Sequence, residues 1–257
     1  MNLVEVFPNP FRKFLAEFDL PLIEKKATCE DCRMTKSEGG FAYKPDLKCC
    51  TFFPFLSNFQ VGAILAEAKT PSEILARLRS FIQTDQAQPL GVAPDQNYQK
   101  KFIKRGVEAF GTDPELLCPY YDRKNTRCGV WNWRGGVCTS FYCESSYGLK
   151  GIEFWRELEK YFLMFEKTLS YDALLNLGFD ENEAGACLKA VPNGILKPFR
   201  FQENLWQEMG AERELLYQKS YEYVNKLSHL EIQRLLGPEA IHMQSKLYQR
   251  VIDLTCK

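Results

Sequence analysis

The stretch CPYYDRKNTRCGVWNWRGGVC, residues Cys118 to Cys138, places reactive and bulky side chains close together. TSFYC follows and ends at Cys143, so that four cysteines and six aromatic residues share 26 residues. The stretch shows no helical period, and its four basic residues outnumber its single acid, Asp122. Such a density of thiols in a segment without helical pattern indicates metal ligation or redox chemistry.

Most other cysteines follow the same tendency to cluster. Eight of the ten fall into two groups, Cys29, Cys32, Cys49 and Cys50, and then Cys118, Cys128, Cys138 and Cys143. The pair Cys29–Cys32 has the Cys-x2-Cys spacing at which two thiolates converge on one ion, typical of zinc and iron–sulfur sites. Neighbouring side chains in an extended segment point to opposite faces, so Cys49 and Cys50 either complete this site or divide between two centres. We therefore predict eight candidate metal ligands that serve one or two centres, and two four-thiolate centres that share ligands between the groups are one such arrangement.

Two cysteines are predicted to lie outside any site. Cys187 and Cys256 each stand alone in a helical pattern, where a free cysteine usually behaves as a small hydrophobic residue.

The composition of the chain and its expected cellular compartment limit the functions that are plausible. The chain has 257 residues, 45% of them hydrophobic, and its 33 basic and 33 acidic residues cancel, which disfavours binding to nucleic acid or an acidic membrane. The N-terminus carries Glu5, two prolines and an Arg-Lys pair, so no signal peptide is predicted. The longest uncharged run, 51–66, is too short to span a membrane and is predicted to be a loop leading into a buried helix. We expect a cytoplasmic protein, where clustered thiols bind metal more often than they form disulfides.

Helical patterns occupy most of the remaining chain. Capping signals and apolar spacing predict helices at 58–69, 70–83, 98–110, 152–165, 171–177, 180–190 and 203–227, then from a Ser228–Glu231 capping box to Gly237-Pro238, and a last helix to about residue 254. Residues 84–97 are predicted to form a linker. The expected fold is mostly α, with an irregular cysteine-rich metal-binding core in residues 1–147 (motifs in 27–145). That core is expected to pack as one unit with a helical part, 148–257.

Charge and burial suggest what surrounds the thiols. Four thiolates around a zinc ion or an oxidised 4Fe–4S cluster leave a charge of about −2, which nearby cations must offset. Arg134 is predicted to donate to a backbone carbonyl or a ligand sulfur and to hold the Cys128–Cys138 loop closed. An aromatic sheath favours an iron–sulfur cluster over zinc, because low solvent exposure protects a cluster. Its members are Phe52, Phe53, Phe55, Tyr120, Tyr121, Trp131, Trp133, Phe141 and Tyr142.

The order of these elements resembles a bacterial cysteine-cluster family described as a zinc- or iron-chelating domain (YkgJ type). The resemblance covers about residues 27–145 and is carried by Cys118-Pro119 and by Cys128, Val130-Trp131, Arg134, Cys138 and Phe141. Two features depart from the family. Gly135 stands where proline is usual, which predicts a looser turn, and sixteen residues separate Cys32 from Cys49 where the family is compact.

The resemblance and the residues leave three functions open. One is an iron–sulfur protein in redox or protein-modification chemistry, and another is a structural zinc protein whose helical half binds a protein partner. A third is a methylase-like enzyme acting on protein lysine, because the flagellin lysine methylases resemble the family in their cysteine motifs and are associated with an iron–sulfur cluster. His229 and His242 are the only histidines, and no Gly-rich phosphate loop is present, so no catalytic residue is predicted.

Overall fold

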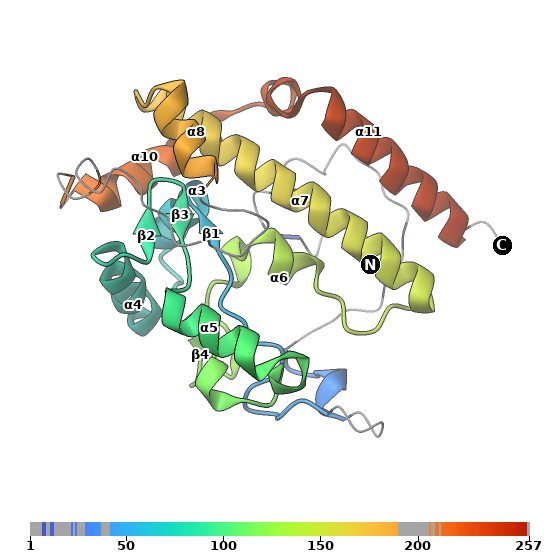
Figure 1. The fold of residues 1–257 in the computed structure, drawn as a ribbon. Helices are drawn as coiled ribbons and strands as arrows, with labels where there is room; N and C mark the ends of the chain where they lie inside the picture. Colours follow the sequence, from blue (N-terminus) through green and yellow to red (C-terminus); the bar gives the residue numbers. More distant parts are fainter. Residues whose placement is uncertain are drawn as a thin grey trace.

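The chain folds into a mostly α-helical structure, as predicted (Figure 1). The computed structural model describes residues 29–36, 42–189 and 212–255, together with 7, 8, 11, 12, 22, 24, 206, 209 and 210. The helices are α3 (Asn58–Ala66), α4 (Ser72–Ile82), α5 (Gln96–Arg105), α6 (Gly136–Ser140), α7 (Gly148–Asn176), α8 (Glu181–Lys189), α10 (Glu212–Lys226) and α11 (His229–Thr255). Short 3-10 turns are η1 (Arg33–Thr35), η2 (Val107–Ala109), η3 (Pro114–Leu116) and η4 (Trp131–Trp133).

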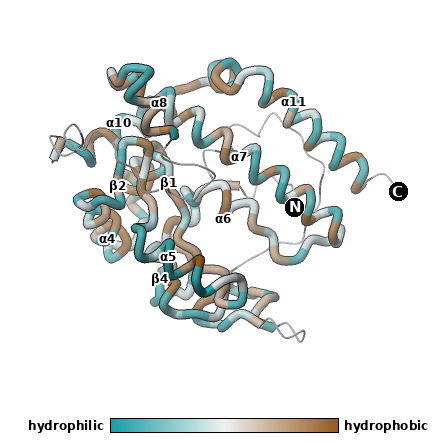
Figure 2. The backbone as a smooth tube through the Cα atoms, viewed as in Figure 1, coloured by the Kyte–Doolittle hydropathy of each residue, from teal (hydrophilic) through white to brown (hydrophobic). Residues whose placement is uncertain are grey.

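The long helix α7 organises one core of the molecule. It runs unbroken through the region where two helices, 152–165 and 171–177, were predicted, because no glycine or proline interrupts residues 166–170. It ends at Asn176, with Leu177 as its C-cap before Gly178, whose φ is a positive 94°, so the helix stops before this glycine as predicted. Helix α11 lies along α7 (Figure 1) and bends at Gly237-Pro238, where the sequence predicted a helix end. Hydrophobic and hydrophilic residues alternate along both helices (Figure 2), as expected when one face meets the core.

Helix α3 is the buried helix expected after residues 51–57. Its residues 58–64 are all buried, and Ser57 and Gln60 form a capping box at its start. It packs closely against α10, because Gly62 has no side chain at the crossing. A Cβ at Gly62 would lie 1.9 Å from the carbonyl oxygen of Tyr217.

The predicted linker at 84–97 is wrong. It contains β2 (Ala87–Gln88) and β3 (Gly91–Val92), which form an antiparallel three-stranded sheet with β1 (Leu56–Ser57) in the order β1-β3-β2. The apolar residues of this stretch are buried, and the hydroxyl of Tyr217 donates to the carbonyl oxygen of Gln88 at 2.8 Å. Gly91, with φ 152°, permits the close passage past Leu56. Helix α5 then begins at Gln96, because Asp95 accepts a capping hydrogen bond from the Tyr98 amide at 2.7 Å.

Candidate metal centre

A two-stranded hairpin positions Cys128. Strand β4 (Tyr121–Asp122) pairs with β5 (Arg127–Cys128), so that Cys128 lies opposite Tyr121. The Asp122 carboxylate stabilises the turn by accepting hydrogen bonds from the amides of Lys124 and Asn125 and from the Asn125 side chain. This use of a short acidic side chain explains why the segment folds without a helical period.

The short helix α6 carries Cys138 and is held by α7. Oε1 of Glu166, in α7, accepts hydrogen bonds from the Gly136 amide and from Nε2 of Gln60, each at 2.7 Å. The expectation that Gly135 loosens this turn is not met. Gly135 has φ −67°, the value that proline would impose, and a Cβ there would lie 3.1 Å from the carbonyl oxygen of Phe55. The turn is therefore tightly packed.

The cysteine doublet is joined directly to the second group of cysteines. The Cys118 amide donates to the carbonyl oxygen of Cys50 at 2.7 Å. Lys48, just before the doublet, has a positive φ of 55°, and its buried ammonium donates to the carbonyl oxygen of Thr126 at 2.6 Å. Sequence reasoning missed Lys48. Its position directly before Cys49 could have indicated its role, because a cluster of thiolates needs nearby cations to offset its negative charge.

Six of the eight predicted ligands line one cavity of about 200 Å³, namely Cys29, Cys49, Cys50, Cys118, Cys128 and Cys138. The other two, Cys32 and Cys143, do not line it. They lie close to it, as shown by the electrostatic interaction of Cys143 with Cys49, Cys32 and Cys29. The two groups, far apart along the chain, are thus brought together in space.

The cavity wall combines apolar side chains with one guanidinium. Phe52, Tyr120, Trp131 and Phe141 line it, as expected of an aromatic sheath. The rest of the predicted sheath does not line this cavity. Phe53 and Trp133 belong to a hydrophobic core, Phe55 packs against that core, and Tyr142 stacks on Trp155 with ring centroids 4.4 Å apart. Tyr121 is buried in β4.

Arg134 lies among the thiols. Its guanidinium carbon lies 3.5 Å from the ring centroid of Trp131, and its charge acts on Cys128, Cys138, Cys29 and Cys49. Two buried donors on the cavity wall, Nε of Arg134 and the hydroxyl of Tyr120, have no hydrogen-bond partner among the residues that the structure describes. A buried donor without a partner is costly, so both suit an acceptor located inside the cavity.

Burial opposes ionisation of the thiols, whereas nearby cations promote it. Burial raises the pKa of Cys128 to about 11 and of Cys143 to about 12, and it raises the pKa values of Cys118 and Cys138 as well. The pKa of Cys49 is lowered, chiefly because Cys50 donates a hydrogen bond to it and secondarily by Arg134 and Lys48. A bound cation would ionise all of these thiols outright.

The thiols do not converge on one point. Among the described residues, no three Cys, His, Asp or Glu side chains lie close enough to hold a metal ion as they stand. Four thiolates around a single zinc ion would have sulfur atoms ~3.8 Å apart, given Zn–S bonds of about 2.3 Å in tetrahedral geometry, and no cavity would remain between them. A cluster of several iron and sulfide atoms holds its thiolates farther apart. As they stand, the thiols form an open lining around the cavity.

No protein-family model matches the chain, and neither a curated protein nor a solved structure matches it.

Within the described part of the chain, no helix has the length and apolar character to cross a membrane. Cys187 is buried in α8, apart from the cavity lining, and Cys256 lies outside the described residues.

Proposed function

We propose that this chain is a cytoplasmic metal-binding protein with a cysteine-ligated iron–sulfur centre, active in redox or protein-modification chemistry. The observation that carries the proposal is the cavity of about 200 Å³ into which six cysteines of both groups are gathered, with Arg134 beside them. If free cysteines were buried here by chance, nothing would explain why Nε of Arg134 and the hydroxyl of Tyr120, on the same cavity wall, have no acceptor among the described residues. A bound cluster would accept such hydrogen bonds at its sulfur atoms.

The cysteine doublet divides between two sets of four thiols. Cys50, Cys118, Cys128 and Cys138 all line the cavity, so these four would hold one centre. Cys143 interacts with Cys49, Cys32 and Cys29, and these four would hold a second. All four residues of the first set line the cavity, whereas Cys32 and Cys143 of the second set do not, so the first set is the stronger assignment.

The surrounding residues have distinct tasks in this proposal. A bound cluster supplies one-electron transfer. Arg134 and Lys48 would offset the negative charge of the thiolates, and the Tyr120 hydroxyl would donate to a sulfur atom. Phe52, Trp131 and Phe141 would exclude water from the centre.

Anaerobic purification without added metal tests the proposal. We expect a brown protein that bleaches in air and contains iron and sulfide. Cys138→Ser should lower the iron and sulfide content, because it removes a thiolate from the cavity, whereas Cys187→Ala should not. A colourless protein with stoichiometric zinc and no sulfide would instead support the structural zinc protein, and equal iron loss in both variants would refute the ligand assignment.

A further inference from the structure

A second hollow opens beside the thiol cavity. It has a volume of about 360 Å³, within the range of small-molecule sites, and it shares Cys29, Cys128, Val130 and Trp131 with the cavity. These shared residues form a common wall. A molecule bound in this hollow, the cleft, would lie directly beside two of the thiols.

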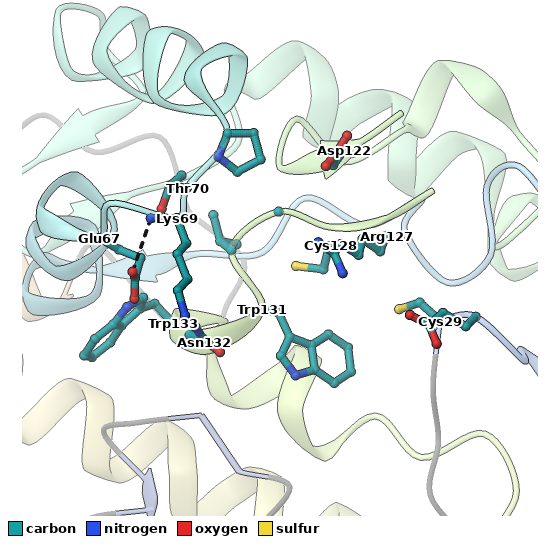
Figure 3. A pocket seen from close by; sticks show the side chains of 14 residues that line it. Cys29, Glu67, Lys69, Thr70, Asp122, Arg127, Cys128, Trp131, Asn132 and Trp133 are labelled. Atoms are coloured by element: carbon teal, nitrogen blue, oxygen red, sulfur yellow. Dashed lines mark hydrogen bonds between the residues drawn. The ribbon is translucent and has the colours of Figure 1, made fainter. Parts of the chain in front are cut away.

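The two sides of the cleft differ in chemistry (Figure 3). Glu67, Lys69 and Trp133 lie on one side, Arg127, Cys128 and Cys29 lie on the other, and Trp131 lies between them. Trp131 is 39% exposed, and its ring already carries the Arg134 guanidinium at 3.5 Å. A stacked cation leaves the other face of an aromatic ring free for a flat apolar group.

The side holding Glu67 and Lys69 presents opposite charges next to each other. Neither side chain takes part in any ion pair among the residues that the structure describes. The Glu67 carboxylate is steadied by the backbone amide of Lys69, which donates to it at 3.3 Å. Nearby, the indole N–H of Trp133 has no hydrogen-bond partner in the described part of the chain, although this residue is only 8% exposed. Two further acids line the cleft, namely Glu30 beside Cys29, and Asp122, whose carboxylate is already occupied by the hairpin turn.

We propose that the cleft binds an α-amino acid with a flat apolar side chain. An amino acid carries its ammonium and carboxylate on one carbon, so it needs an acid and a base side by side. Glu67 accepts from the ammonium, whereas Lys69 and the Trp133 N–H donate to the carboxylate. The side chain lies over Trp131 and points toward Cys29 and Cys128. This site rests on the described side chains alone and does not require that the thiols hold a metal.

Calorimetric titration of the full chain, as purified, with three matched probes tests the site. L-Phenylalanine carries both charges, phenethylamine carries only the ammonium, and 3-phenylpropionate carries only the carboxylate. We expect L-phenylalanine to bind about tenfold more tightly than either analogue, since each loses one charge-assisted hydrogen bond.

Variants then separate the two contacts. Lys69→Met should weaken L-phenylalanine and 3-phenylpropionate about tenfold and leave phenethylamine unchanged, and Glu67→Gln should do the reverse for the two analogues. Lys124→Met, on the exposed hairpin turn outside the cleft, is the control and should change nothing. Absence of L-phenylalanine binding, equal affinity for all three probes, or insensitivity to Lys69→Met would overturn the site, whatever the metal content of the protein.

Discussion

At the scale of single residues, Arg134 interacts both with an aromatic ring and with the thiols of the cavity. It stacks on Trp131, lies close enough to four thiols to act on them electrostatically, and has a buried Nε–H to which no described residue offers an acceptor. The sequence predicted its closeness to the thiols from the register of the second motif. The stacking on Trp131 could not be predicted, because it depends on how the 3-10 turn η4 places residues three apart.

Replacing Arg134 should make the nearby thiols less acidic. In metal-free protein, Arg134→Leu removes a cation that lowers the pKa of Cys128 and Cys49, so both pKa values should rise, by roughly one unit. The pH dependence of iodoacetamide alkylation, followed residue by residue by mass spectrometry, measures this. Arg123→Leu, an exposed neighbour on the hairpin turn, is the control. An alkylation profile of Cys128 that does not move would show that Arg134 does not act on the thiols.

At the scale of elements, the tight crossing of α3 and α10 depends on Gly62. Gly62→Ala would place a methyl group 1.9 Å from a backbone oxygen of α10, so the two helices must separate. We expect the free energy of unfolding to fall by about 3 kcal/mol. Gly185→Ala, in α8, is the matched control, because nothing lies within 4 Å of its Cβ position. It should stabilise the protein by about 0.5–1 kcal/mol. Urea titration measures both values, and equal effects would contradict the packing argument.

Glu166 makes the contact between α6 and α7 sensitive to pH. Burial raises its pKa to about 7, above the usual 4.5 that it regains on unfolding. The folded state therefore binds a proton that the unfolded state has released between these values, so this contribution to stability is present below pH 4.5 and is lost as the pH rises to 7. The loss amounts to at most about 3 kcal/mol. Glu166→Gln keeps an oxygen acceptor for the Gly136 amide and should remove the dependence. Urea titrations at pH 5 and pH 8 compare the two proteins, and parallel losses of stability would refute this role.

Local patterns predicted elements well where the cause was local. The Ser228–Glu231 capping box forms as expected, with the Ser228 amide donating to Glu231 at 2.8 Å, and the bend at Gly237 is at the predicted place. The failures come from distant contacts. The stretch 84–97 has the prolines and polar residues of a linker, yet β1 and Tyr217 hold it in a sheet. The helix α6 is too short to show a period and depends on Glu166, thirty residues away.

At the scale of the whole molecule, the cysteine-bearing and helical parts share their cores. Phe7 and Phe11 pack against Phe162 of α7, with the Phe11 and Phe162 ring centroids 4.1 Å apart. Helix α3 packs against α10, and Glu166 fixes the helix that carries Cys138. Each part therefore buries apolar and polar surface that the other would leave exposed. For the candidate site, the sequence predicted eight candidate cysteines, six of which line one cavity, but it did not predict the cavity, because its walls come from segments that only the whole fold assembles.

Neither part should fold by itself. Residues 1–147 would expose the face of α3 that α10 covers, and residues 148–257 would lose the partners of Phe162 and of the buried Glu166. We expect each fragment to lack the dispersed proton resonances of a folded domain. The full chain should unfold in urea in one transition, with circular dichroism and tryptophan fluorescence coinciding. Both hydrophobic cores contain residues from each side of the 147/148 boundary, and three of the four tryptophans lie in these cores. Mixing the two fragments should restore part of the helical signal if the shared core drives folding. A fragment 148–257 with native helicity and a cooperative transition of its own would show instead that the helical part is an independent domain.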